Sequence, residues 1–193
     1  MTKNVEGPNA FIFMKVGKHA GEEFGEIMER KREEQRKAGA IWWGYGGPTL
    51  HPINKVQPFV KYALENHGVV RLLMQVMDSS HPNIEAYADE HSSDGKNWYS
   101  IPENIAVRGS RYAMILDEIV PDEQQLDLGQ YRVPLGPSQG KVGAEYVSGR
   151  VDKACLEYVG KSNVEVSSKL VDVHYSARVK SPYAVLLRGG KND

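Results

Sequence analysis

Residues 68–78, GVVRLLMQVMD, give the strongest strand signal in the chain and decide how its first half is interpreted. An apolar run of this length between turn-forming residues predicts a buried β-strand. Two further apolar runs and two amphipathic segments precede it. The predicted order of the first half is therefore strand, helix, strand, helix, strand.

The chain before this run begins with a strand and a helix. Residues 9–17, NAFIFMKVG, are a short apolar run ended by glycine, which predicts a buried strand. In residues 19–39, HAGEEFGEIMERKREEQRKAG, the apolar side chains of Phe24, Ile27 and Met28 recur at helical spacing. Charges of both signs alternate along the rest of the segment, which favours a solvated helix face over a nucleic-acid-binding arm.

A second strand and a second helix follow. Residues 40–43, AIWW, predict the strand, and residues 44–48, GYGGP, the turn that leaves it. Residues 51–68, HPINKVQPFVKYALENHG, predict a helix in which Pro58 marks the first turn, because proline disrupts a helix interior. The residues expected to face the core are Val56, Val60, Ala63 and Leu64.

The second half has short strands separated by turn-forming residues. The expected elements are strands at 84–91, 98–102, 104–108 and 111–119, a polar helical turn or loop at 121–130, a short strand and glycine-rich loop at 131–143, a helix or strand at 151–159, and one or two strands at 164–190. The fold class is therefore α+β, with a mostly mixed or antiparallel sheet.

Length and composition fit one soluble domain. The 193 residues, with 40% hydrophobic and 25% charged side chains, are enough for one core. We expect a single domain over residues 1–193, with a flexible N-terminus at 1–9, C-terminal strands at 160–193 packing on it, and a flexible tail at 189–193. The sequence has no apolar run of membrane-spanning length and no signal-peptide pattern. A single cysteine, Cys155, excludes an internal disulfide, so we expect a cytoplasmic protein without membrane contact.

The charge balance argues against one class of function. The chain has 24 basic and 25 acidic residues, and a formal net charge of −1. A protein that coats duplex nucleic acid is usually basic, because phosphate neutralisation supplies most of its affinity. Near-neutral charge still permits binding of a free nucleotide or of one exposed base.

The stretch AIWWGYGGPTLHP, residues 40–52, is the strongest candidate for a ligand site. In a strand, Trp42 and Trp43 point to opposite faces, so at most one joins the core from this strand, and the other is an edge residue or a pocket wall. An indole beside glycine-flanked backbone amides suits a planar base, which stacks on the ring and is read by the amides. The alternative to a ligand site is a tryptophan that fills the core, followed by a glycine turn, with no ligand. The glycines concerned are Gly44, Gly46 and Gly47.

The order of the first half resembles a known family. FIFMKV, a helix, IWWG, a second helix and GVVRLLMQVMDSSHPNIEAYADE, over residues 10–119, are similar to the layout of YTH and EVE domains in the PUA-like superfamily. The resemblance implies a small β-barrel flanked by helices that holds a modified base of a nucleic acid in an aromatic cage. Trp42 or Trp43 matches the cage tryptophan, although WWGYGG replaces the usual Trp-Cys-Ser type of stretch. The candidates for a second cage aromatic are Tyr45, Tyr87 and Trp98.

Polar residues near these aromatics are candidates to hold the rest of a nucleotide. Lys15 and His19 end the first strand, and His51 and Gln57 follow the aromatic stretch, where they are expected to read the edge of the base. Two glycine-containing loops, AVRGSRYA (106–113) and RVPLGPSQGKVG (132–143), suit a phosphate through backbone amides and a cation. The phosphate-binding candidates in these loops are Arg108, Ser110, Arg111, Arg132, Ser138 and Lys141.

Other chemistries have less support. His19, His51 and His81 follow neighbouring strands and could converge, but no Cys partner or H-x-x-x-H spacing indicates zinc. Cys155 lies among apolar neighbours, as a core residue does, and no G-x-S-x-G motif is present.

The sequence therefore predicts a binding module for a nucleotide, or for a modified or extruded base in nucleic acid, without a cofactor or metal. One alternative is a small nucleotide-processing enzyme with His51 or His19 as general acid–base. Another is a protein-interaction factor, of a phage or defence type, whose exposed aromatics contact a protein partner.

Overall fold

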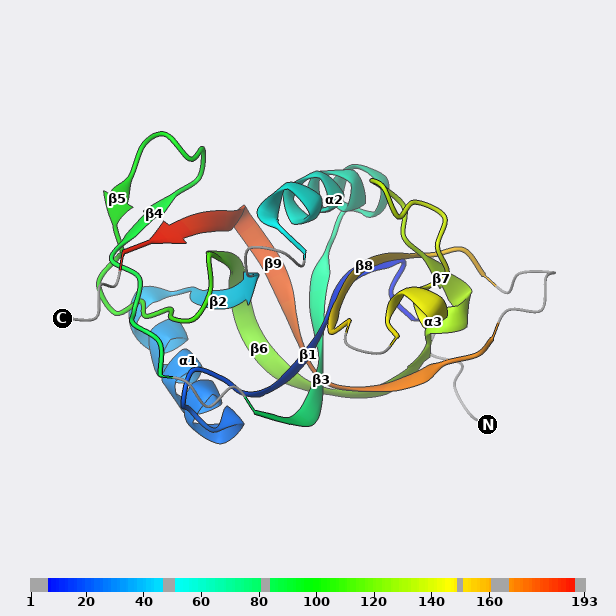
Figure 1. Ribbon diagram of the computed structural model, residues 1–193, viewed down its shortest axis with the longest axis horizontal. Coiled ribbons are helices and arrows are strands. Elements are labelled where there is room, and N and C mark those ends of the chain that lie inside the picture. The colour runs from blue at the N-terminus through cyan, green and yellow to red at the C-terminus, as the bar shows by residue number, and fades with distance from the viewer. Residues whose placement is uncertain (1–6, 47–50, 81–83, 149–150, 161–166, 190–193) are drawn as a thin grey trace.

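The strand–helix–strand–helix–strand order of the first half is present, and further strands follow it (Figure 1). The structure, a computed structural model, describes residues 7–46, 51–80, 84–148, 151–160 and 167–189. Its elements are β1 (Ala10–Lys18), α1 (Phe24–Ala38), β2 (Ile41–Gly46), α2 (Ile53–His67), β3 (Arg71–Ser80), β4 (Glu90–Ser92), β5 (Tyr99–Ser100), β6 (Tyr112–Asp127), the 3-10 turn η1 (Leu128–Gln130), β7 (Tyr131–Arg132), α3 (Gly143–Tyr146), β8 (Lys153–Tyr158) and β9 (Leu170–Arg188).

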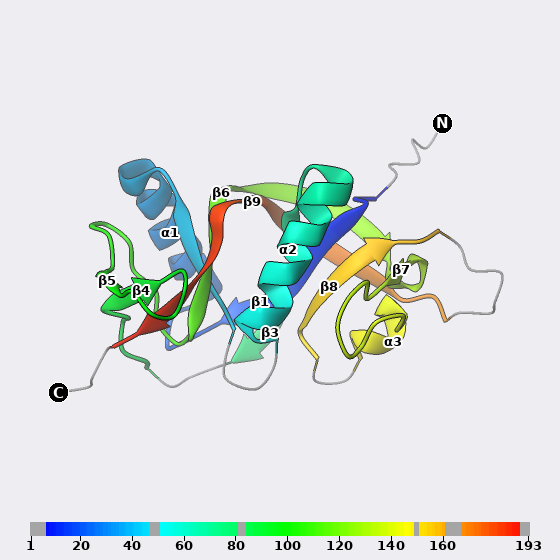
Figure 2. The same ribbon diagram turned by 90° about the horizontal axis from the view of Figure 1, so that it is seen from above.

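The strands form one mixed sheet with the order β2–β6–β9–β3–β1–β8–β7. β4 pairs with one end of β9 and carries β5 on its other side. β1 and β3 are parallel neighbours, and the segment α1–β2–α2 supplies the long crossover that a parallel pair needs. The remaining pairs of described strands are antiparallel, and β6 and β9 run side by side along most of their lengths (Figure 2).

The sheet is open, which corrects the expectation of a small closed β-barrel. β2 is an edge strand that bonds to β6, and three strands separate it from β1. The sheet nevertheless curls until the two strands face each other. The hydroxyl of Tyr45 donates to the carbonyl of Phe13 at 3.3 Å, and the indole N–H of Trp43 donates to the Met14 sulfur at 3.2 Å. These large side chains hold β1 and β2 farther apart than the ~4.8 Å of a backbone ladder, so a gap remains where a barrel would close.

Local sequence signals set the ends of both long helices. The N–H of Glu23 donates to the carboxylate of Glu26 at 2.8 Å in the first turn of α1, and Gly39 ends this helix in the left-handed conformation. α2 begins at Ile53 and includes Pro58 in its interior, so the expectation that Pro58 marks the first turn is wrong. Within the described ranges, no helix has the length and apolar character needed to cross a membrane.

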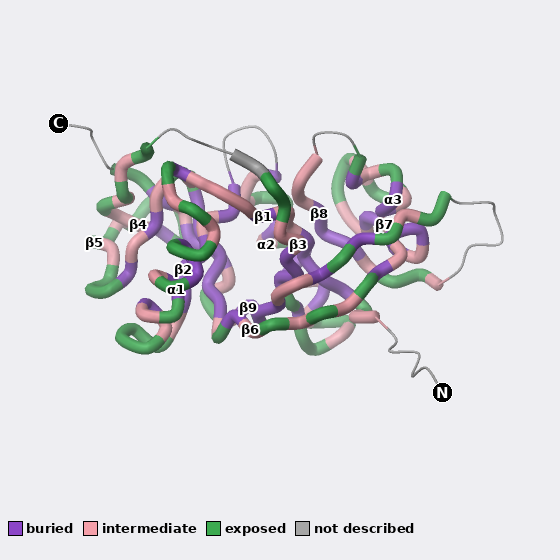
Figure 3. Tube along the Cα trace, turned by 90° about the horizontal axis from the view of Figure 1, so that it is seen from below, coloured by how far each residue is buried: buried purple, intermediate pink, exposed green. Residues whose placement is uncertain are grey.

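Three clusters of buried side chains form the core. The largest combines side chains of the sheet with those of α1 and α2, and it includes Trp43 and Tyr45. A second lies around β8, η1 and α3. Trp42 belongs to a third cluster because neighbours in a strand point to opposite faces. Figure 3 shows the buried trace concentrated in the middle of the sheet and exposed residues in the β4–β5 hairpin.

Three segments differ from the sequence-based expectation. Residues 121–127, expected as a polar turn or loop, continue β6 as a strand. Residues 104–108, expected as a strand, instead pass beside α1, whose side chains bond to Ala106. Residues 84–91, expected as a strand, belong to a strand only from Glu90, where β4 begins. In each case pairing with a distant part of the chain determined the conformation, and local pattern does not reveal such pairing.

Candidate ligand-binding site

A cavity of about 510 Å³ occupies the gap between β1 and β2; we call it the seam cavity. Its walls also include residues of α1, the end of β3 and the segments 107–110 and 152–153. The volume lies within the ~300–1,000 Å³ range of small-molecule sites. The residues singled out in the sequence as base-binding candidates that line it are Lys15, His19, Trp43, Gly44, Tyr45 and Gly46.

The two adjacent tryptophans have different environments. Trp43 lines the seam cavity, and the rest of its indole is packed in the largest core cluster. Trp42 is buried in the core on the opposite face of β2, where its ring makes a T-shaped contact with His91 at a centroid distance of 4.8 Å, so the expectation that at most one of the two joins the core is wrong. Of the two candidates, Trp43 is therefore the one that faces the cavity.

Tyr45 forms the second aromatic part of the wall. Only 2% of the residue is exposed, and burial raises the pKa of its hydroxyl well above the ordinary value. The Lys153 ammonium lies 5.6 Å from the ring centroid, within the range of a cation–π contact. The phenol therefore stays neutral, and its ring places an aromatic face beside a cation.

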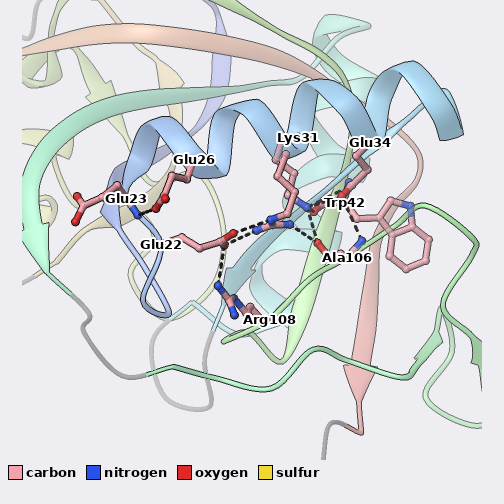
Figure 4. A network of polar contacts seen from close by, with 9 residues as sticks. Glu22, Glu23, Glu26, Lys31, Glu34, Trp42, Ala106 and Arg108 are labelled. Atoms are coloured by element: carbon pink, nitrogen blue, oxygen red, sulfur yellow. Dashed lines mark hydrogen bonds and ion pairs between the residues drawn. The ribbon is translucent and has the colours of Figure 1, made fainter.

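The free edge of β2 is covered by α1 at Trp42 (Figure 4). The N–H of Trp42 donates to the Glu34 carboxylate at 2.6 Å, and its carbonyl accepts from the Lys31 ammonium at 2.6 Å. The same two side chains bond to the N–H and carbonyl of Ala106, at 3.3 and 2.9 Å. Lys31 and Glu34 thus stand between two backbone segments and replace the hydrogen bonds of a missing strand.

Gly44 presents the same strand edge without this cover. Backbone groups of an antiparallel strand alternate in direction with a period of two residues, so Gly44 directs its N–H and carbonyl to the same side as Trp42. Gly44 lines the seam cavity, and the place of a side chain on it is taken by Ser110 and Val107. The cavity therefore contains a strand edge with one donor and one acceptor.

Most cations around the cavity are paired. Lys18 lies 2.6 Å from Glu23, and Lys31 lies 2.9 Å from Glu34. Arg30 and Arg108 both contact Glu22, at 2.8 and 3.4 Å. Among the described lysines of the wall, the exceptions are Lys15, which has no carboxylate partner there, and Lys153, which reaches only its neighbour Asp152 at 3.5 Å.

Burial and pairing shift two pKa values beside the cavity. Burial lowers the pKa of Lys31 to about 8, although the nearby Glu34 carboxylate favours the charged amine. Burial also opposes ionisation of Glu22, but the guanidinium groups of Arg30 and Arg108 outweigh it and lower the pKa of that carboxyl. Glu22 therefore remains a fixed negative charge, whereas Lys31 titrates close to neutral pH.

The remaining candidates lie away from the seam cavity. His51 and Ser138 line a second cavity, and Gly47 lies outside the described residues. Arg111 is exposed, and its N–H donates to the carbonyl of Gly46 at 2.8 Å. Gln57 on α2 and the exposed Lys141 line neither cavity.

The other aromatic and loop candidates also have defined places. Tyr87 lies against Arg108, whose guanidinium is 4.8 Å from the ring centroid, and Trp98 lies against Arg188 in the β4–β5 region at 4.0 Å. Arg108 and Ser110 line the seam cavity. Arg132 instead donates to the carbonyls of Gly129 and Tyr131.

The three candidate histidines are not gathered in one described site. His19 lines the seam cavity, His51 lines the second cavity, and His81 lies outside the described residues. Within the part of the chain that the structure describes, no group of three or more His, Cys, Asp or Glu side chains is arranged to hold a metal ion.

Some cavity residues were missed in the sequence. Lys31 follows Ile27 and Met28 at spacings of four and three residues, which places it on the buried face of α1, so helical periodicity could have identified it. Lys153 and Asp152 reach the cavity because β8 pairs with β1, as in the pair Met14 and Lys153. That pairing joins residues far apart in sequence, and no local signal predicts it.

Comparison with models of known protein families finds no match to this chain, and comparisons with curated proteins and with solved structures also find none. The resemblance to YTH and EVE domains therefore stays a hypothesis based on element order.

Proposed function

We propose that the seam cavity binds one nucleotide, either free or as a modified or extruded base of a nucleic acid. The observation that carries the proposal is the combination, in one cavity, of two aromatic walls, an open strand edge and two lysines without strong carboxylate partners. Each part suits a different portion of a nucleotide.

The aromatic walls suit the base. Trp43 and Tyr45 are alternate residues of β2 and therefore point to the same face of the strand. Stacking of a base on such a ring contributes about 1–3 kcal/mol and tolerates different bases, because every base has a π face. The hydrogen bonds from Trp43 to Met14 and from Tyr45 to Phe13 fix both rings before a ligand arrives. Such preorganisation reduces the entropy that binding costs.

The open strand edge at Gly44 suits recognition of the base. A peptide unit offers a donor and an acceptor, as does the hydrogen-bonding edge of a nucleobase. Gly44 lines the cavity, and the direction of its N–H and carbonyl away from β6 turns both groups toward the edge of a planar ligand. A change in the pattern of donors and acceptors on the base would leave one of these buried groups unpaired, which is the basis for selectivity.

The charges suit a single phosphate. Lys15 and Lys153 are the wall lysines with the most capacity to pair with an anion, since Lys18 and Lys31 have carboxylate partners at 2.6 and 2.9 Å. Two lysines can neutralise one phosphate, whereas duplex binding requires a long row of cations. The formal net charge of −1 agrees with this assignment.

The test is a tryptophan-fluorescence titration of the full chain with a panel of nucleoside monophosphates and short single-stranded oligonucleotides, with normal and modified bases. The variants Trp42→Phe and Trp43→Phe form a matched pair, because the two residues are adjacent and only Trp43 lines the cavity. We expect saturable quenching that persists in Trp42→Phe and is lost or strongly reduced in Trp43→Phe.

Two results would overturn the proposal. One is the absence of any saturable response from folded protein across the panel. The other is equal quenching in both variants, because the ligand would then lie elsewhere. Turnover of a nucleotide during the titration would instead reassign the site to an enzyme, with His19 as the histidine that lines the cavity.

A further inference from the structure

A second cavity, of about 350 Å³, lies at the N-terminus of α2; we call it the helix cavity. Its wall is formed by the first turns of α2, the loop after β7, and single residues of α3 and β8. The lining is largely apolar and includes Phe59, Val133, Pro134, Leu135 and Cys155. A ligand there would therefore bury an apolar body.

The polar part of the helix cavity favours an anion. Among the described residues of its lining, Lys55 is the one lysine or arginine, and none is an aspartate or glutamate. α2 has 15 residues, and its N-cap, Pro52, makes no side-chain capping hydrogen bond. The first turn also has no acidic residue. An uncapped helix N-terminus carries partial positive charge and backbone N–H groups without helical partners, which together attract anions.

His51 supplies an independent sign of a missing partner. It lines the cavity and is 6% exposed, and its Nε2 lies 3.1 Å from the hydroxyl of Tyr146. Its Nδ1 is buried and has no hydrogen-bond partner among the described residues. Burial, followed by the positive charges of Lys55 and Lys153, lowers the pKa of His51 to about 4, so the ring is neutral at pH 7. When Tyr146 donates to Nε2, Nδ1 carries the imidazole proton and can donate to an oxygen.

We propose that the helix cavity binds a small monocarboxylate with an apolar body, such as a medium-chain fatty acid. The carboxylate lies at the N-terminus of α2 beside Lys55, and the hydrocarbon lies against Phe59, Val133 and Leu135. A free carboxylate fits better than a neutral apolar ligand, because it satisfies the helix terminus and the single cation together. This proposal does not depend on nucleotide binding in the seam cavity.

The experiment is a titration of the ¹⁵N-labelled full chain with octanoate, followed by backbone amide shifts. Octanol, which lacks the charge, and acetate, which lacks the apolar body, serve as control ligands. We expect saturable shifts of the Ile53 and Asn54 amides with octanoate, and little response to either control. The indole N–H of Trp43 should stay in place, since it belongs to the seam cavity.

Two substitutions test the charge without disturbing the core. Asn54→Asp places a carboxylate in the first turn of α2, which favours the helix through its dipole but repels a bound anion. Lys55→Gln removes the cation, and Lys61→Gln, on an exposed turn of the same helix, is the matched control. We expect both cavity variants to weaken octanoate binding at least roughly tenfold, which corresponds to about 1.4 kcal/mol, and the control to leave it unchanged.

The design also separates binding from folding. Asn54→Asp should keep or raise the thermal midpoint, so a loss of octanoate binding in this variant cannot be attributed to unfolding. The proposal is overturned if octanoate at millimolar concentration moves no amide of α2. It is also overturned if octanol binds as well as octanoate, or if Asn54→Asp leaves the affinity for octanoate unchanged.

Discussion

Two positions on the same edge of β2 differ in what lies beside them. At Trp42 the edge is covered, because Lys31 and Glu34 bond to both of its backbone groups. At Gly44, two residues farther along, the edge borders the seam cavity. The register of the strand is the same at both positions, so the difference arises from α1 and not from the strand itself.

The comparison shows how an unpaired strand edge becomes available to a ligand. Exposed edges invite unwanted pairing, and proteins usually cover them. Here the edge is covered by the ion pair of Lys31 and Glu34, whose side chains are 4% and 1% exposed. Burying this pair costs free energy, because both charges lose their hydration. The cover extends along β2 only as far as these two side chains reach, and the cavity begins beyond it.

The largest expected effect comes from removing the cover. In Glu34→Ala, Lys31 becomes a buried charge without its carboxylate, and the N–H groups of Trp42 and Ala106 lose their acceptor. Breaking a buried pair in this way costs about 3–5 kcal/mol. We therefore expect the free energy of unfolding, measured with urea, to fall by roughly that amount.

The control for this prediction is Glu33→Ala on the same helix. Glu33 pairs with Arg36 and Lys37 at the surface, where ion pairs contribute little, so its loss should barely change the urea midpoint. Equal midpoints for the two variants would show that the Lys31–Glu34 pair does not support the edge.

The second prediction concerns how tightly the far end of β2 is packed. A methyl group on Gly46 would overlap the ring of Tyr112, which is 1% exposed and enclosed by the largest core cluster. Gly46→Ala should therefore destabilise the protein by about 3 kcal/mol, at the upper end of the usual cost of overpacking. Gly25→Ala, in the first turn of α1 with open space around it, should instead stabilise it by about 0.5 kcal/mol.

Thermal unfolding of both glycine variants checks this prediction. A normal melting temperature for Gly46→Ala would mean that the strand has room to move away from Tyr112. The ligand cavity beside it would then be deformable, and the fixed walls assumed for base stacking would lose their support.

Periodicity was sufficient to predict the elements that bury one regular face. The strands at β1, β2 and β3 and the helices at α1 and α2 follow from apolar spacing, and the core positions Val56, Val60 and Ala63 of α2 are confirmed. The strand over residues 121–127 was missed, because its side chains are mostly polar and give no strand pattern. Its conformation comes from backbone pairing with β9. The sheet curls but does not close, because the large side chains of Trp43 and Tyr45 lie between β2 and β1. A local sequence pattern does not predict this contact.

For the candidate site, the sequence predicted the direction of side chains within one segment, but not which segments meet. The alternation of Trp42 and Trp43 could be inferred, and so could the proximity of Lys15 and Trp43 if their strands lay close. The separation of His51 from the seam cavity could not, since it depends on how the chain packs after β2. Loops converge through tertiary packing, and the sequence shows only that each of them is polar.

The third prediction uses pH to examine the chain just beyond the open edge. His51 has an ordinary pKa of 6.5 when unfolded and about 4 when folded, because it is buried near Lys55 and Lys153, with Asp152 acting in the opposite sense. The unfolded chain binds the extra proton between these values. The stability that the neutral ring contributes is therefore complete above pH 6.5 and is lost as the pH falls toward 4.

Urea unfolding at pH 7 and pH 4.5 measures this contribution. The wild-type protein should lose about 2 kcal/mol more than His51→Asn between the two values. Asparagine is the matched substitution because the backbone of residue 51 has a φ of 54°, which asparagine tolerates well. The same loss in both proteins would show that His51 is not buried in its neutral form.

The last prediction has the smallest effect and concerns the charge beside the open edge. Lys153 reaches its neighbour Asp152 only at 3.5 Å and lies over Tyr45, so it is free to pair with a phosphate. Lys153→Gln should raise the Kd of a nucleoside monophosphate roughly tenfold, or about 1.4 kcal/mol, at low salt.

The control is Lys96→Gln, in the exposed turn between β4 and β5, which should leave the Kd unchanged. The difference between the two variants should shrink as ionic strength rises, because dissolved ions screen the attraction between the ammonium group and the phosphate. A loss of affinity that is independent of salt would mean that Lys153 acts through the packing of Tyr45, and the phosphate would then have to be assigned to Lys15.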